Sequence, residues 1–153
     1  MKTPSFGYRG RAIGTVAGLL VLSAFVAPDL SLGLNERSVW SGVYTTTQAE
    51  RGRAAFEASC AGCHKPDLSG RGPIPALRGE DFTGERHGQS VADLYGLIRS
   101  TMPPGRPESL SGDAYADVVA YLLSENAYPP GEGDLPSRED ALRVIVFDEP
   151  TAQ

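Results

Sequence analysis

Capping residues and apolar periodicity predict three short helices in the middle and C-terminal parts of the chain. Thr47 with Glu50 forms a capping-box pattern, which predicts a helix over residues 47–59. Ser90 with Asp93 repeats this pattern and predicts a second helix. That helix must end before the Pro-Pro pair that follows it, because a residue preceding proline is disfavoured in the helical conformation.

Ser111 is expected to cap a third helix, over residues 112–125. Its apolar residues recur at helical spacing and predict one buried face: Tyr115, Val118, Val119 and Leu122. Residues 65–88 contain repeated Gly and Pro and predict a long loop. Residues 142–147 form a short β-prone run, which either packs back on the domain or belongs to an assembly.

Glycine and proline are frequent along the chain, with 18 Gly and 12 Pro in 153 residues. We therefore expect a mainly α domain whose short helices are joined by long loops. Such a domain has a thin side-chain core, and a bound cofactor would complete it.

The N-terminal residues have the pattern of an export signal. Three basic residues precede a mostly apolar run over residues 12–27, as in a secretory signal peptide. This run is shorter than the roughly 20 residues that a membrane-spanning helix needs. We expect residues 1–33 to be a cleaved signal peptide, with an uncleaved membrane anchor or a lipid anchor as alternatives. Residues 34–44 are interpreted as a linker, 45–130 as the folded domain and 131–153 as a C-terminal extension.

The net charge of the chain is negative, with 14 Lys and Arg against 19 Asp and Glu, or −5 with neutral His. Loss of residues 1–33 removes three basic residues and Asp29, which brings the net charge to −7. A nucleic-acid partner requires a basic surface, so the charge argues against one. The same charge would steer encounter with a basic patch on a protein partner.

The motif with the clearest chemistry is Cys60-Ala61-Gly62-Cys63-His64, which contains both cysteines of the chain. A C-x-x-C-H run is the attachment site of a c-type haem. At this spacing the two thiols add to the two vinyl groups of one haem, and the adjacent imidazole becomes the proximal ligand of the iron. The motif therefore predicts one haem c, covalently attached through Cys60 and Cys63 and ligated by His64.

Three other interpretations of the motif are open at this point. A redox-active C-x-x-C of the thioredoxin kind follows a strand in a βαβ unit, whereas a helix is predicted before Cys60. A zinc site has the right number of donors if His87 joins the motif, but the adjacent Cys63 and His64 can hardly both reach one tetrahedral ion. A disulfide between the cysteines closes a short strained loop and leaves His64 without a role.

An electron-carrying haem that excludes small molecules needs a sixth iron ligand, and Met102 is the candidate. It is the one methionine besides Met1, and Pro103 and Pro104 stiffen the backbone after it. A thioether ligand favours Fe(II) and raises the reduction potential. The alternative is that Met102 fills a gap in the core. His87 is a rival ligand, although its polar loop is more typical of an exposed histidine.

On these residues the chain resembles the class I cytochrome c family over about residues 43–130. The resemblance rests on C-A-G-C-H, on P-A-L-R-G, on T-M-P-P and on the helix A-D-V-V-A-Y-L-L. It implies the cytochrome c fold, in which three or more short helices with long loops surround one covalently bound haem. It also implies that the first helix crosses the last, with Gly52 and Phe56 against Tyr121 and Leu122.

The family resemblance further implies that the carbonyl of Pro75 accepts a hydrogen bond from the far nitrogen of His64, which would fix the imidazole tautomer. Arg78 is implied as a residue that either reaches a haem propionate or lies in solvent. More narrowly, the chain is similar to small monohaem cytochromes that serve quinoprotein (PQQ-dependent) dehydrogenases. It departs from them at His87, where relatives often have tryptophan.

The predicted function is one-electron transfer by a haem with His64 and Met102 as ligands, between a periplasmic dehydrogenase and a respiratory acceptor, either an oxidase or another cytochrome. The chain has no paired-carboxylate signature, so we expect a periplasmic electron carrier rather than an enzyme. A membrane is a partner only if the N-terminal segment stays uncleaved and anchors the domain at the outer face. The alternatives are a haem subunit of a membrane-associated dehydrogenase or oxidase complex, and a haem-based protein that binds small ligands. A haem peroxidase usually has more than one haem.

Overall fold

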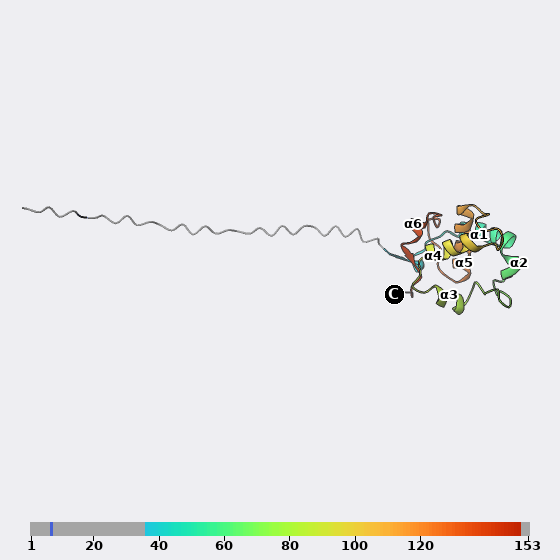
Figure 1. The fold of residues 1–153 in the computed structure, drawn as a ribbon. Coiled ribbons are helices and arrows are strands. Elements are labelled where there is room, and N and C mark those ends of the chain that lie inside the picture. The colour runs from blue at the N-terminus through green and yellow to red at the C-terminus, as the bar shows by residue number, and fades with distance from the viewer. Residues whose placement is uncertain (1–6, 8–35, 151–153) are drawn as a thin grey trace, which may run out of the picture. The chain divides into compact units, whose positions relative to one another are not determined.

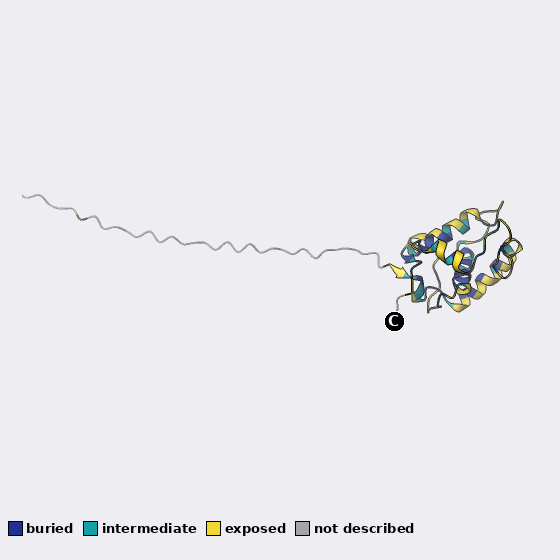
Figure 2. Cartoon of the chain, turned by 90° about the horizontal axis from the view of Figure 1, so that it is seen from below, coloured by how far each residue is buried: buried dark blue, intermediate teal, exposed yellow. Residues whose placement is uncertain are grey.

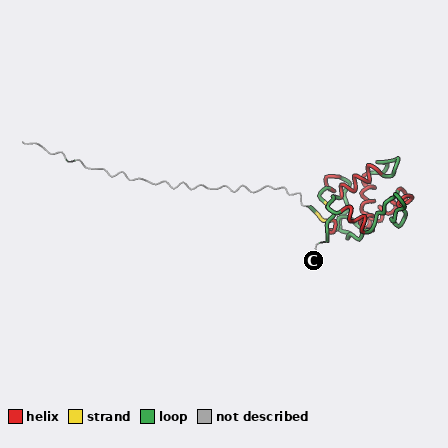
Figure 3. Tube along the Cα trace, turned by 60° about the horizontal axis from the view of Figure 1, so that its bottom comes forward, coloured by secondary structure: helices red, strands yellow, loops and turns green. Residues whose placement is uncertain are grey.

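Short helices are the main secondary structure in the part of the chain that the computed structural model describes, which is Gly7 and residues 36–150 (Figure 1). The elements in chain order are β1 (Arg37–Ser38), the 3-10 helix η1 (Val39–Ser41), α1 (Thr46–Ser59), α2 (Ala61–His64), α3 (Glu80–Arg86), α4 (Val91–Thr101), α5 (Gly112–Glu125), α6 (Glu139–Leu142) and β2 (Ile145–Val146). Long loops join them, so the predicted mainly α fold is confirmed (Figure 3).

The predicted export segment, residues 1–33, lies outside the described residues except for Gly7. Among the residues that the structure describes, no helix is both long enough and apolar enough to cross a membrane.

The start of α1 differs from the prediction. Its N-cap is Thr45, whose side-chain oxygen accepts a hydrogen bond from the backbone N–H of Gln48 at 3.1 Å. Thr47 lies inside the first turn, so the predicted Thr47–Glu50 capping box is wrong. The buried side chain of Gln48 exchanges two hydrogen bonds with the backbone of Leu135, at 2.9 and 2.6 Å. Of the three consecutive threonines, 45–47, the one that caps α1 is thus the one whose helix start is also held by a tertiary contact, from Gln48 to Leu135.

The predicted starts of the other two helices are confirmed. At α4 the backbone N–H of Ser90 donates to the Asp93 carboxylate at 2.8 Å, and the N–H of Asp93 donates back to the Ser90 hydroxyl at 3.2 Å. The helix ends at Thr101, before the two prolines. At α5 the hydroxyl of Ser111 accepts from the N–H of Ala114 at 3.1 Å.

The segment predicted as one long loop, residues 65–88, contains the helix α3. Its first turn carries Glu80 and Asp81 and its last turn carries Arg86, which is the charge order that a helix dipole favours. One large side chain, Phe82, is buried against the rest of the domain. A helix of seven residues is too short to show a sustained apolar periodicity. The surrounding glycines and prolines therefore led to the prediction of a loop.

Helices α1 and α5 cross at close range and form the centre of the domain (Figure 1). A Cβ atom on Gly52 would lie 1.8 Å from the carbonyl oxygen of Asp117, so only glycine permits this approach. One turn further on, the rings of Phe56 and Tyr121 pack with centroids 5.4 Å apart, and Phe56 is fully buried. This is the crossing that the family resemblance implied.

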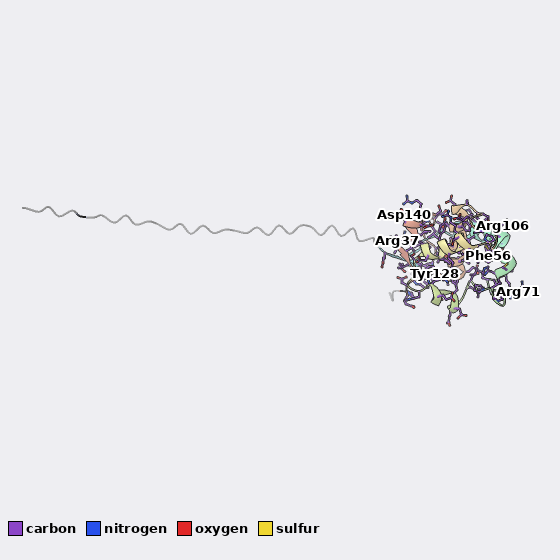
Figure 4. All side chains as sticks on the ribbon, in the orientation of Figure 1. Arg37, Phe56, Arg71, Arg106, Tyr128 and Asp140 are labelled. Carbon is purple, nitrogen blue, oxygen red and sulfur yellow. The ribbon has the colours of Figure 1, made fainter. Side chains whose placement is uncertain are left out.

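Both ends of the described domain pack into one core. β1 pairs in parallel with β2, and Arg37 lies opposite Ile145. The residues that this arrangement buries before α1 are Val39, Val43 and Tyr44, and those after α5 include Leu135, Leu142, Ile145 and Phe147 (Figure 2). The predicted linker, 34–44, therefore contributes three core residues from its described part, and residues 131–150 pack back on the domain. Figure 4 shows Arg37, Tyr128 and Asp140 at this end, away from Arg71 and Arg106.

Candidate functional site: a cavity beside the C-x-x-C-H turn

The C-x-x-C-H residues form a tight turn directly after α1. The N–H of Cys60 donates to the carbonyl of Phe56 at 2.8 Å and so closes α1. The carbonyl of Cys60 then accepts from the N–H groups of Cys63 and His64 at 3.1 and 3.0 Å, which builds α2. As a result Cys60 is half-buried, Cys63 is exposed and His64 is buried.

All three residues line a cavity of about 480 Å³, a size within the usual range for small-molecule and cofactor sites. Its walls are mainly apolar side chains from α1, α3, α4 and α5: Phe56, Phe82, Leu94, Ile98, Val118 and Leu122. Leu97, the one large apolar side chain that is exposed among the described residues, at 48%, lies at the same cavity. An apolar group seated there would cover it.

The imidazole of His64 is oriented by the backbone of a neighbouring loop. Its Nδ1 lies 3.0 Å from the carbonyl oxygen of Pro75, so Nδ1 carries the proton and donates it to this bond. In the neutral imidazole this tautomer leaves Nε2 without a proton, which is the state that a metal ligand requires. The loop is held close by Gly70, where φ is +64° and a Cβ would lie 2.3 Å from the carbonyl oxygen of Ile74.

Met102 reaches the same cavity from another helix. It follows α4 in extended conformation, with its N–H bonded to the carbonyl of Ile98 at 2.8 Å. Its own carbonyl accepts a hydrogen bond from the hydroxyl of Tyr115 on α5 at 3.0 Å. The fold thus brings together all five residues that were predicted for the site, Cys60, Cys63, His64, Pro75 and Met102, at one cavity.

The electrostatics of the cysteines argue against a thioredoxin-type centre. Burial, with a smaller contribution from Cys63, raises the pKa of the Cys60 thiol above its ordinary value of 9.0. A reactive redox thiol needs a lowered pKa. The motif also follows a helix, and the sheet of the described residues has only two strands and no βαβ unit.

The zinc and disulfide interpretations find no support either. Within the described residues no group of three or more His, Cys, Asp and Glu side chains is placed to hold a metal ion. His87 does not line the cavity of the motif; it is exposed, and its Nε2 lies 3.6 Å from a carboxylate oxygen of Glu149. Cys60 and Cys63 are both free thiols.

The donor set fits a haem. Two free thiols, an imidazole with its coordinating nitrogen deprotonated and a thioether meet at one mainly apolar cavity. Thioether attachment needs thiols, and His/Met ligation is one of the ways in which proteins hold haem iron.

Comparison with known proteins agrees with this geometry. Residues 47–122 match the family described as "Cytochrome C oxidase, cbb3-type, subunit III". This segment of the chain is therefore a c-type cytochrome domain, which confirms the resemblance to c-type cytochromes.

A particular relative is the fructose dehydrogenase cytochrome subunit of Gluconobacter japonicus, which is 34% identical over 94 residues. The alignment covers 52% of this chain and 19% of the relative, so the similarity spans about a fifth of that protein. Both matches support haem-based electron transfer.

Two residues of the site were missed by sequence reasoning. Tyr115 was predicted only as part of a buried helix face, yet its hydroxyl holds the backbone of Met102. Arg86 stood in a segment predicted as loop, yet it lines the cavity from the end of α3. Neither has a sequence signal, since both act through partners distant in the chain.

Proposed function

We propose that the chain is an exported electron carrier that binds one haem c through Cys60 and Cys63, with His64 and Met102 as axial ligands. The observation that carries this proposal is that these four side chains, from α2 and its N-cap and from the end of α4, line one mainly apolar cavity. The bound haem supplies reversible one-electron chemistry at its iron.

The residues of the chain would keep the structural rearrangement during electron transfer small. The Pro75 carbonyl fixes the orientation of His64, and the Tyr115 hydroxyl holds the backbone of Met102. Retention of both ligands in the two oxidation states keeps the rearrangement small, and the apolar walls exclude water. Because the cavity lining offers no pair of carboxylates for acid–base work, we infer electron transfer rather than catalysis.

Electrons would pass at the edge of the site beside Cys63, which is exposed. Redox partners of this kind dock through transient interfaces that bury less than about 1,200 Å². The negative net charge, −5 for the whole chain and −7 without residues 1–33, favours a partner with a basic patch. We propose a periplasmic dehydrogenase as donor and an oxidase or another cytochrome as acceptor.

A second candidate function is that of a haem subunit in a membrane-associated dehydrogenase complex. The observation in its favour is the similarity to a protein that is itself named a cytochrome subunit. Purification from the native membrane with a large flavin or quinone subunit in fixed proportion would support this candidate. A freely soluble monomer would support the carrier.

The test of the proposal is the visible spectrum of the protein made with haem-attachment machinery, recorded oxidised, reduced, and reduced under carbon monoxide. A sharp low-spin reduced spectrum that the gas leaves unchanged is expected for His/Met ligation. A high-spin or gas-sensitive spectrum would contradict the electron carrier and support a haem protein that binds small ligands. In parallel, the double variant Cys60→Ala, Cys63→Ala must lose haem on a denaturing gel; haem that stays attached would contradict the predicted thioether bonds.

A further inference from the structure

Arg86 lines the cavity, and the proposed function gives it no role. It is the last residue of α3, with its side chain only 15% exposed. Its Nε–H group is buried and has no hydrogen-bond partner among the described residues. Protein atoms enclose this nitrogen, so the donors that can face a bound group are those of the terminal nitrogens.

The contacts that Arg86 does make leave its positive charge available to the cavity. One terminal nitrogen lies 3.2 Å from the carboxylate of Glu85, and the other lies 3.2 Å from the side-chain oxygen of Gln89. Glu85 is 69% exposed, so water screens most of its charge. The guanidinium carbon stands 5.8 Å from the ring centroid of Phe82, which holds the group in place beside the apolar wall.

We infer that Arg86 binds a carboxylate of the haem, an inference that rests on the proposed haem site. A haem carries propionate groups, and a carboxylate is the acceptor that suits a guanidinium whose two terminal nitrogens each make one hydrogen bond and have a second N–H to donate. The family resemblance offered Arg78 for this contact. The structure instead places Arg78 on the exposed loop before α3, and it does not line the cavity.

The charge of Arg86 has a direct consequence for the iron. Arg86 and Glu85 are the charged side chains that line the cavity, and Glu85 is the more exposed of the two. A cation paired with a haem carboxylate offsets a negative charge that would otherwise stabilise Fe(III). Arg86 therefore raises the reduction potential, and its removal lowers it.

The experiment compares three variants of the haem-loaded protein by spectroelectrochemistry. Arg86→Gln removes the charge, Arg86→Lys keeps it but loses the planar donor fork, and Arg78→Gln removes an exposed arginine as the matched control. We expect Arg86→Gln to shift the ferric-to-ferrous ratio toward Fe(III) by about tenfold, which corresponds to about 59 mV for one electron. Arg86→Lys should recover part of this shift, and Arg78→Gln should show little.

Resonance Raman spectroscopy of the haem carboxylate bending band gives a second readout that a purely structural role would not move. The band should shift in both Arg86 variants and stay in place in Arg78→Gln. If haem is attached and both Arg86 variants keep the wild-type potential and band, the assignment of Arg86 is wrong. Failure to attach haem in the wild-type protein would overturn the proposed function instead, so the two outcomes are distinguishable. If Arg86→Gln does not fold, the Raman band of Arg86→Lys decides.

Discussion

At the scale of single residues, the two proposed iron ligands are held in different ways, His64 at its side chain and Met102 at its backbone carbonyl. His64 donates to the carbonyl of Pro75, and the carbonyl of Met102 accepts from the hydroxyl of Tyr115. A hydrogen bond to the far nitrogen fixes an imidazole directly, whereas the thioether of Met102 is restrained only through its main chain. We therefore expect the methionine side of the site to be the more easily altered.

Replacement of Met102 tests the sixth ligand. Met102→Ala should leave the haem attached, since the thiols are unchanged, but should open the iron and lower its potential because a soft donor to Fe(II) is lost. Carbon monoxide should then bind the reduced protein, as a spectral titration would show. An unchanged spectrum and potential would mean that Met102 is not the ligand.

Tyr115→Phe tests the support of that ligand. Loss of one hydrogen bond to the Met102 carbonyl is worth about 0.5–1.5 kcal/mol, so carbon monoxide should compete with the thioether up to about tenfold better. Tyr95→Phe is the matched control, because its hydroxyl lies 3.4 Å from the carbonyl of Gly112 and has no hydrogen bond to Met102. Equal carbon monoxide affinity in the two variants would show that the Tyr115 hydroxyl does not support the Met102 ligand.

At the scale of elements, the helices are positioned by one close crossing and by their caps. The crossing of α1 and α5 sets where the C-x-x-C-H turn emerges, because α2 begins two residues after α1 ends. The cap of α4 sets the direction of the helix that ends at Met102. Changes at either place should act on the site from a distance.

Gly52→Ala tests the crossing. Its methyl would meet the Asp117 carbonyl oxygen at 1.8 Å, so the helices must separate, at a cost of about 1–3 kcal/mol or more. Gly96→Ala is the control, because it makes the same change inside α4 with no atom within 4 Å, and it should stabilise by about 1 kcal/mol. Urea unfolding of the haem-loaded proteins measures both. Equal effects of the two substitutions would show that the close approach is unimportant.

The α4 cap makes stability depend on pH. Hydrogen bonds from the side chain and the backbone of Ser90 lower the pKa of Asp93 below its ordinary value of 3.8. A carboxyl whose pKa is lower in the folded than in the unfolded state stabilises the fold above the unfolded value, and this stability is lost as the pH falls through the folded value. Because Asp93 is exposed and solvent screens its charge, Asp93→Asn should lower the unfolding free energy by only about 0.5 kcal/mol at pH 7, and the difference should vanish in acid.

Asp113→Asn is the control for this pH profile, since Asp113 occupies the first turn of α5, where Ser111 alone provides the side-chain cap. Denaturant midpoints of wild type and both variants, measured from pH 7 downward, give the comparison. A difference between wild type and Asp93→Asn that persists unchanged below pH 3 would contradict the assignment.

At the scale of the whole molecule, the segments on either side of the matched family region, residues 47–122, are part of the core rather than appendages. Phe147 packs its ring 5.8 Å from that of Tyr128, and its backbone bonds to Gly88 and Gln89 at 2.7 and 2.9 Å. The C-terminal segment thereby braces the turn between α3 and α4, which adjoins Arg86.

Phe147→Ala should cost about 3–5 kcal/mol of stability, the usual loss for a fully packed phenylalanine. Glu132→Ala, an exposed change in the same segment, should alter stability by no more than about 0.5 kcal/mol. Thermal and urea unfolding of the haem-loaded proteins provide the values. Similar small losses in both variants would mean that residues 131–150 are not integral to the fold.

The sequence by itself determined the features that depend on neighbours along the chain. The spacing of Cys60, Cys63 and His64 indicated the haem chemistry, and local capping patterns placed the starts of α4 and α5. The family resemblance added the Pro75 contact and the helix crossing, and the structure contains both.

Only the tertiary structure decided the features that depend on distant partners. Thr45 rather than Thr47 caps α1 in a fold where Leu135, 87 residues away from Gln48, holds the first turn. Residues 36–44 and 131–150 carry little periodicity. They pack against each other, and residues 131–150 also pack against α1 and α4, which lie far away in the sequence. The position of Arg86 at the cavity has the same origin, because a polar loop pattern contains no information about the apolar walls that other helices bring beside it.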